Sequence, residues 1–191
     1  VAISGNLLLL VVFWELTSLA SYLLIAHWSD RSDARAGARM SLAITAGGGL
    51  ALLGGVLLIG AVVGSFELDQ VLVAGDQLRA DPRYPWILGL VLLGAFAKSA
   101  QFPFHFWLPQ AMAAPTPVSA FLHSATLVKA GVFLLLRLYP ALSGTPEWLY
   151  LVAGAGLVTL LVGAWSAIFQ HDLKGLLAYY TVSHLGLITL L

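Results

Sequence analysis

Six ionisable side chains lie inside the long apolar runs of this sequence or at their edges. They are Glu15, Lys98, His123, Lys129, Lys174 and His184. A charge at the centre of a bilayer costs about 3 kcal/mol on insertion scales, so such residues usually mark ion or proton pathways. One acid, three lysines and two histidines on four apolar segments predict a row of titratable groups near mid-membrane, joined by water.

Each of these residues also has a structural alternative. Glu15 could form a structural ion pair, and Lys98 could extend its amine to the membrane interface. His123 and His184 could make ordinary contacts between helices. Lys174 could be an interfacial lysine. Asp172 is the expected N-cap of the last segment, and a lysine in the first turn after it calls for a partner such as Asp172.

Local sequence around the six residues adds support. Ser18 shares the helix face of Glu15, and an acid there must be protonated or paired. Lys129 lies six positions after His123, a rise of about 9 Å along a helix, so contact between them needs a bridging group. Four of the supporting residues lie at or beside a predicted helix break. The full set is Ser18, Ser99, Gln101, Pro103, His105, Ser124 and Thr126.

Composition narrows the class of protein. Of 191 residues, 60% are hydrophobic and only 9% are charged, and the mean hydropathy is +0.92. This excludes a water-soluble enzyme or binding module and a disordered chain. A net charge of zero disfavours nucleic acid as a partner, and the absence of cysteine excludes disulfides and thiolate sites.

Other chemistries lack their motifs. The central segments hold one carboxylate, too few for a zinc or iron site. There is no G-x-S-x-G and no phosphate-cradling loop. We therefore expect no catalytic residue, no metal and no cofactor.

Six apolar segments are long enough to cross a bilayer as helices, which predicts an all-α, polytopic membrane helical bundle. They span residues 5–26, 40–63, 86–101, 118–139, 148–169 and 173–191. The loop between the second and third is expected to be solvated, with at most one interfacial turn. Gly47, Gly48 and Gly49 are expected to let helices pack closely. We expect a fragment of one longer transmembrane domain.

The third segment is expected to break near Gln101–Pro103 and to continue as a half-helix over 104–113. Four prolines interrupt residues 102–120, yet this stretch is too apolar for a solvated loop. Irregular backbone at membrane depth is tolerated inside protein or beside water, and broken helices mark ion sites in transporters. Lys98 would then lie near the negative end of a helix. An ordinary interfacial loop is the alternative.

Three stretches of the sequence resemble a known family. Residues 13–24 read FWELTSLASYLL, residues 98–137 begin KSAQFPFHFWLPQAMAAPTPVSAFLHSATLVKAG, and residues 172–186 read DLKGLLAYYTVSHLG. They resemble the proton-conducting family shared by Mrp-type multisubunit Na⁺/H⁺ antiporters and the pumping subunits of respiratory complex I. The resemblance covers nearly the whole chain.

The resemblance implies a fold of two inverted helical repeats, of which this chain holds most of the first and the start of the second. It implies that Glu15 pairs with Lys98 on the broken helix. His123 and Lys129 would connect to Lys174 and His184, which carry protons toward a second half-channel. Separation of the Glu15–Lys98 pair would release the lysine proton, and cation movement elsewhere would bias the pair.

Residues 123–131, HSATLVKAG, resemble the large-subunit branch of the Mrp antiporters, whereas complex I subunits more often read HAATMVTAG. The resemblance implies a non-enzymatic, proton-translocating subunit of a Na⁺/H⁺ antiporter in the bacterial cell membrane. Its partners would be other antiporter subunits, H⁺, a monovalent cation and the bilayer. The alternatives are a pumping subunit of complex I or of a membrane-bound hydrogenase, and a scaffold that transports nothing.

Overall fold

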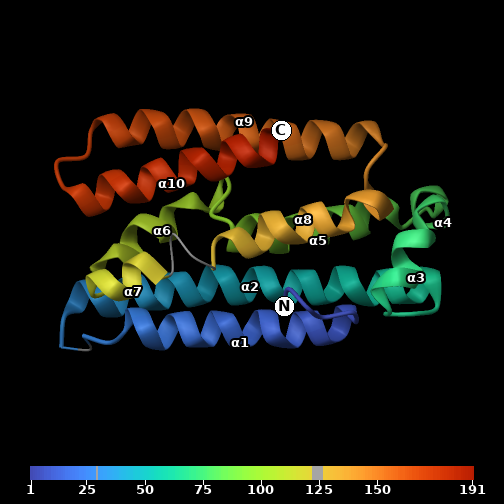
Figure 1. The fold of residues 1–191 in the computed structure, drawn as a ribbon, viewed down its shortest axis with the longest axis horizontal. Coiled ribbons are helices and arrows are strands. Elements are labelled where there is room, and N and C mark those ends of the chain that lie inside the picture. Colours follow the sequence, from blue (N-terminus) through green and yellow to red (C-terminus); the bar gives the residue numbers. More distant parts are fainter. Residues whose placement is uncertain (29, 122–126) are drawn as a thin grey trace.

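The structure, a computed structural model, describes residues 1–28, 30–121 and 127–191, and its longer helices stack in three layers (Figure 1). Helices α9 and α10 form the first layer, α5 and α8 form the middle layer, and α2 and α1 form the third. The bounds of these helices are α1 Leu7–Ile25, α2 Ser32–Val63, α5 Tyr84–Lys98, α8 Lys129–Leu142, α9 Pro146–Ile168 and α10 Leu173–Leu190.

Short helices fill both ends of the stack. At one end lie α3 and α4, and at the other end lie the short helical elements that follow α5 in the chain (Figure 1). Their bounds are α3 Leu68–Val73, α4 Gly75–Ala80, η1 Phe104–Phe106, α6 Trp107–Gln110, η2 Ala111–Ala113 and α7 Thr116–Ala120. Within the described ranges every regular element is a helix, so the all-helical class is confirmed.

Three of the described helices are long and apolar enough to cross a bilayer: α1, α2 and α9. The apolar helix α5 is shorter, with 15 residues. A span needs about 20 residues at 1.5 Å of rise each, so α5 alone falls short of the hydrocarbon thickness. The six expected segments therefore correspond to three long spans together with shorter apolar helices.

The second helix begins well before the expected residue 40. It starts at Ser32, and its first turns carry Asp33, Arg35 and Arg39. Hydropathy marks only the apolar part of a helix, whereas alanine and arginine continue it into the polar region. This extension has a packing role: a Cβ at Gly37 would overlap the backbone of Gln110, so α2 supports the broken segment.

The expected single helix over 118–139 is interrupted. The described part contains α7, then Leu127 and Val128 in a turn, and α8 begins at Lys129. Prolines at 115 and 117 suit a helix start, so α7 begins where the sequence favours it. Lys129 therefore opens a helix and is not in the middle of one.

The loop expected between the second and third helices is a structured brace. Arg79 of α4 donates from Nη1 to the carbonyls of Pro140, Ala141 and Ser143, at 3.1–3.2 Å. A cation on open carbonyls complements the negative end of α8. The brace fixes the end of α8 against α5, where hydropathy alone indicated only a solvated connection.

Two apolar clusters form the core. One joins α1, α2, α5 and α8 and contains Trp14, which is fully buried. The other surrounds Trp107 of α6, which is also fully buried. Trp107, Leu108 and Ala111 of the broken segment are therefore buried in the protein, whereas Phe102 and Phe106 are exposed.

Candidate functional site

The site is built at the point where α5 ends. Lys98 is the last helical residue, and Ala100 follows with φ of +50°. The amide of Gln101 donates to the carbonyl of Phe96 at 3.0 Å. This is a Schellman ending with alanine in place of the usual glycine, so the break falls slightly earlier than the expected Gln101–Pro103.

Side chains pair with backbone groups on both sides of the break. Trp107 Nε1 donates to the carbonyl of Ala97 at 2.9 Å. Ser99 Oγ accepts from the amide of Val132 on α8 at 3.0 Å. A helix end in an apolar environment needs such partners, because unpaired backbone groups are costly there. The break is thus a supported feature of the fold.

Lys98 is fully buried, with 0% of its surface exposed. Its Nζ donates to Ser18 Oγ at 2.7 Å and to the carbonyl of Trp14 at 3.1 Å. The same atom lies 5.4 Å from the centre of the Trp14 ring. All these contacts are neutral, so they stabilise an ammonium without closing an ion pair.

Glu15, which belongs to α1, lies near Lys98 of α5. Its carboxylate attracts the Lys98 ammonium, but the lysine donates to Ser18 and Trp14 and not to the carboxylate. The Oε1 atom is buried and has no hydrogen-bond partner among the described residues. The expected pair is therefore brought together but is not in direct contact. Such a pair can hold a proton in two ways, on the amine or on the carboxylate.

Gln101 and His105 follow the break. Gln101 has 0% of its surface exposed, and both polar atoms of its amide are without partners in the part of the chain that the structure describes. His105 is half-buried and stacks on Phe102 with ring centres 5.9 Å apart. The bond between Phe102 and Pro103 is cis. Polar side chains thus continue from Lys98 into the broken segment.

Lys174 binds the other end of the broken segment. Its Nζ donates to the carbonyl of Ala114 at 2.9 Å and contacts that of Met112 at 3.5 Å. Asp172 caps α10 as expected, accepting from the Gly175 amide at 2.7 Å. The expected pairing of Lys174 with Asp172 is wrong. The carboxylate is used by the cap, and the lysine reaches the carbonyls of the neighbouring segment.

Two further predicted residues, Lys129 and His184, are exposed. Lys129 is exposed and lines a crevice of about 540 Å³ with Thr17 and Ser21 of α1. His184 is exposed on α10 and stacks on Tyr180, with ring centres 6.1 Å apart. Three further predictions lie outside the described residues: His123, Ser124 and Thr126.

Charges outside the spans are arranged differently. Exposed ion pairs join neighbours in sequence, such as Arg83 Nε to Asp81 Oδ1 at 2.9 Å. The hydrogen bond from Arg83 lowers the pKa of the Asp81 carboxyl. Exposed pairs of this kind contribute little to stability. These pairs are local, whereas Lys98 and Lys174 are held by hydrogen bonds to other parts of the fold.

Sequence reasoning missed Thr159, a fully buried threonine in the middle of α9. Its Oγ1 accepts from the amide of Phe102 at 2.8 Å and donates to the carbonyl of Ala155 at 2.6 Å. The signal was a hydroxyl in the apolar middle of this helix. Such a residue needs a partner, and the broken helix supplies an amide.

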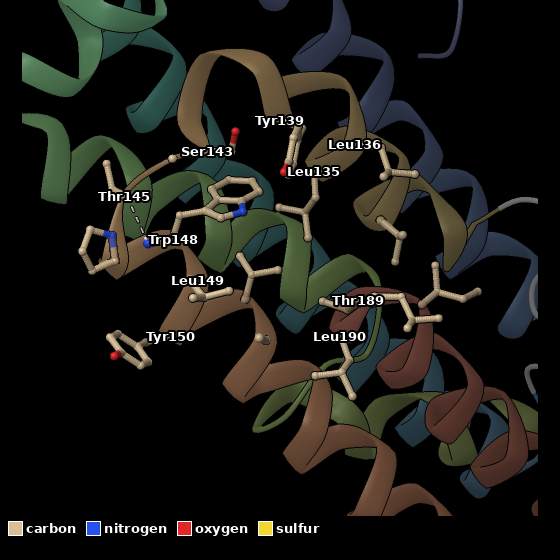
Figure 2. A pocket seen from close by; sticks show the side chains of 17 residues that line it. Leu135, Leu136, Tyr139, Ser143, Thr145, Trp148, Leu149, Tyr150, Thr189 and Leu190 are labelled. Carbon is tan, nitrogen blue, oxygen red and sulfur yellow. Dashed lines mark hydrogen bonds between the residues drawn. The ribbon is translucent and has the colours of Figure 1, made fainter.

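A larger crevice of about 660 Å³ lies between α8, α9 and α10 (Figure 2). Its labelled walls are mainly aliphatic and aromatic, with Thr145 capping Trp148 at one rim. Within the described ranges, no lysine, histidine or carboxylate lines it. Among the described residues, no three His, Cys, Asp or Glu side chains gather as metal ligands. Lys98 and Glu15 lie elsewhere, where α5 contacts α1.

Comparison with known families identifies the family of this chain. Residues 4–191 match the transmembrane family described as NADH:quinone oxidoreductase/Mrp antiporter, and the chain belongs to that family. This confirms the resemblance of the three motifs.

Individual relatives are antiporter subunits. The chain is 65% identical over its full length to the A/B subunit of a probable K⁺/H⁺ antiporter of Rhizobium meliloti, covering 19% of that protein. It is 54% identical over 98% of its length to the A subunit of the Na⁺/H⁺ antiporter of Alkalihalophilus pseudofirmus, covering 23%. The chain thus spans about a fifth of the length of these curated relatives.

A solved structure also matches. The Mrp complex from Dietzia sp. DQ12-45-1b contains a chain of similar fold, with a TM-score of 0.93 and 42% identity. The match covers 98% of this chain and 21% of that one. The family is a transmembrane one, so this chain is a multi-pass membrane protein of the bacterial cell membrane.

Proposed function

We propose that this chain forms part of the proton path of a multisubunit monovalent cation/H⁺ antiporter. The observation that carries the proposal is Lys98, a fully buried lysine at a helix break whose contacts are all neutral. A buried, incompletely compensated charge is costly, and proteins keep such groups at ion and proton sites. The names of its relatives support antiport as the whole protein's activity.

The proposed path begins with the Glu15–Lys98 pair. A nearby carboxylate favours the ammonium form of the lysine, and separation of the two leaves burial to favour the neutral amine. The lysine would then give up its proton through water. The serine that accepts from Lys98 Nζ at 2.7 Å offers a neutral resting contact that either form of the amine can keep.

Beyond the pair, the proposed order continues through residues that the family motifs share. They are His123, Lys129, Lys174 and His184. Gln101 and His105 support the transfer, because their polar side chains follow Lys98 into the broken segment. The exposed His184 would face a later part of the longer protein.

The same family supports three proposals about architecture and partners. The chain would be a fragment of a single proton-translocating domain, with six apolar segments contributed to a fold of inverted repeats. The full protein would assemble with other antiporter subunits. Its bound ions would be H⁺ and a monovalent cation, with Na⁺ and K⁺ both named among the relatives.

The test uses the full-length protein in its complex, in everted membrane vesicles. Glu15→Ala and Lys98→Ala should abolish cation-driven proton movement while the complex still assembles, and parallel assays with Na⁺ and K⁺ would identify the cation. Wild-type exchange in an assembled Lys98→Ala complex would overturn the proposal. Proton pumping that needs a quinone reductase or hydrogenase partner, and no cation, would establish the redox-pump alternative.

A further inference from the structure

Three consecutive glycines in the middle of α2 have very different surroundings. A Cβ built at Gly47 meets no atom within 4 Å. One built at Gly48 overlaps the Cβ of Ala97, the residue before Lys98. One built at Gly49 overlaps Oε1 of Glu15 and lies 2.7 Å from its carboxyl carbon. The run therefore contains an open position, a helix-packing position and a position filled by a carboxylate.

We propose that Gly49 is a positioning residue that sets where the Glu15 carboxylate lies relative to the Lys98 ammonium. This inference rests on the proposed function of that pair. The missing Cβ leaves room for the carboxylate directly against the backbone of α2. The Trp14 ring, whose Cδ1 lies 3.3 Å from the same point, forms a second wall of this space.

Two observations separate this role from ordinary close packing. Gly48 shows what packing requires, since its neighbour is a methyl group on the facing helix α5. Gly49 instead faces the carboxylate of the one acid in the site, whose Oε1 is buried and has no hydrogen-bond partner among the described residues. Nonbonded heavy atoms settle about 3.5 Å apart, so any side chain at 49 must displace the carboxylate.

Displacement would change the distance between the two charges, because the lysine is fixed independently. Lys98 comes from α5 and is held by Ser18 and the Trp14 carbonyl of α1. Lys98 is the charged group that attracts the Glu15 carboxylate. From α2, the carboxylate meets the backbone of Gly49. Coulomb energy rises steeply at short distance in a poorly screened site, so a small shift alters proton release.

The first experiment measures exchange against pH in everted vesicles with the full-length complex. Gly49→Ala should lower the rate about tenfold or more, since a misplacement of 1 Å can cost up to 10²-fold, and should shift the pH of half-maximal activity. Gly47→Ala adds the same methyl group two residues away into open space, so it should retain the wild-type rate and profile. A wild-type profile for Gly49→Ala would overturn the proposal.

The second experiment is a thermal double-mutant cycle on the detergent-solubilised complex. Gly49→Ala should lower the melting temperature when residue 15 is glutamate. In a Glu15→Ala background the same change should be neutral or stabilising, because space is available and alanine favours helix. An equal loss in both backgrounds would show packing alone and overturn the proposal.

The cycle also separates the two hypotheses. If Glu15→Ala retained exchange, the proposed proton path would fail, yet the cycle would still report the contact between Gly49 and the carboxylate. If Gly49→Ala prevents assembly, recovery of the complex by the added Glu15→Ala change supports the contact. Failure of the double variant to assemble would contradict it.

Discussion

Two lysines border the broken segment, and they are held in different ways. Lys98 ends α5, is fully buried, and donates to a hydroxyl and a carbonyl of another helix. Lys174 lies in the first turn of α10, is half-buried, and donates to carbonyls of the broken segment itself. Lys98 is attracted by the carboxylate of Glu15, whereas Lys174 binds backbone carbonyls.

The difference shows how the same residue type serves two tasks. A cation on carbonyls near a helix end complements partial negative charge, which fixes a segment in place. A cation in the core beside a buried carboxylate can gain or lose its proton as that carboxylate moves. We therefore expect Lys98 to be sensitive to any change in its chemistry, and Lys174 to depend first on its hydrogen-bond donors.

The largest effect should come from Lys98→Arg. Arginine keeps the charge but does not release a proton at ordinary pH, so exchange should fall about 100-fold or more, as for loss of a proton-transfer group. Lys98→Met should be equally inactive and less stable than the wild type, because it leaves the Glu15 carboxylate without its neighbouring cation and removes the donor to Ser18. Exchange assays and melting temperatures of the assembled complex measure both. Activity in the arginine variant would show that Lys98 acts only as a fixed charge.

Substitutions of Lys174 should have the second-largest effect. Lys174→Met leaves the Ala114 carbonyl without its lysine donor and should lower stability by about 1–3 kcal/mol. Lys174→Arg restores donors, so it should recover the melting temperature. We expect it not to recover the exchange rate, since Lys174 belongs to the proposed path. Full recovery of both would make Lys174 a structural latch.

Arg79 is a cation that binds backbone carbonyls but lies outside the proposed proton path. Arg79→Gln removes charged donors from the end of α8 and should cost about 1.5–3 kcal/mol of stability, with the pH profile of exchange unchanged. Arg83→Gln is the matched control, because its partner Asp81 is a neighbour in an exposed pair, and the melting temperature should stay the same. A shifted pH profile in Arg79→Gln would extend the proton path to the brace.

The smallest effect should come from Ala100→Gly, at the end of the helix that carries Lys98. Ala100 has a φ of +50°, a conformation that costs L-residues with a Cβ about 1–2 kcal/mol. Glycine removes this cost but loses more chain entropy on folding, so we expect a gain of about 1 kcal/mol or less. Melting temperatures would measure it. A loss of stability would show that the Ala100 methyl group contributes more by packing than its backbone strain costs.

Sequence patterns predicted the elements better than the contacts. The apolar runs and the Asp172 cap gave the positions of α1, α9 and α10 closely, because length and capping residues act locally. The prolines gave the broken segment for the same reason. The early start of α2 and the α3–α4 brace were missed, because a hydropathy pattern does not distinguish charged helical turns from loops.

The amino-acid sequence alone determined that this chain lies in a membrane, that its third helix breaks, and that Glu15 and Lys98 are costly residues to bury. Those conclusions follow from the cost of burying charge and backbone, which depends on residue type and spacing. Only the tertiary structure decided the partners of each charge. Lys98 reaches Ser18, Lys174 reaches Ala114, and Gly49 faces Glu15, because these contacts join residues from different helices whose packing no local pattern encodes.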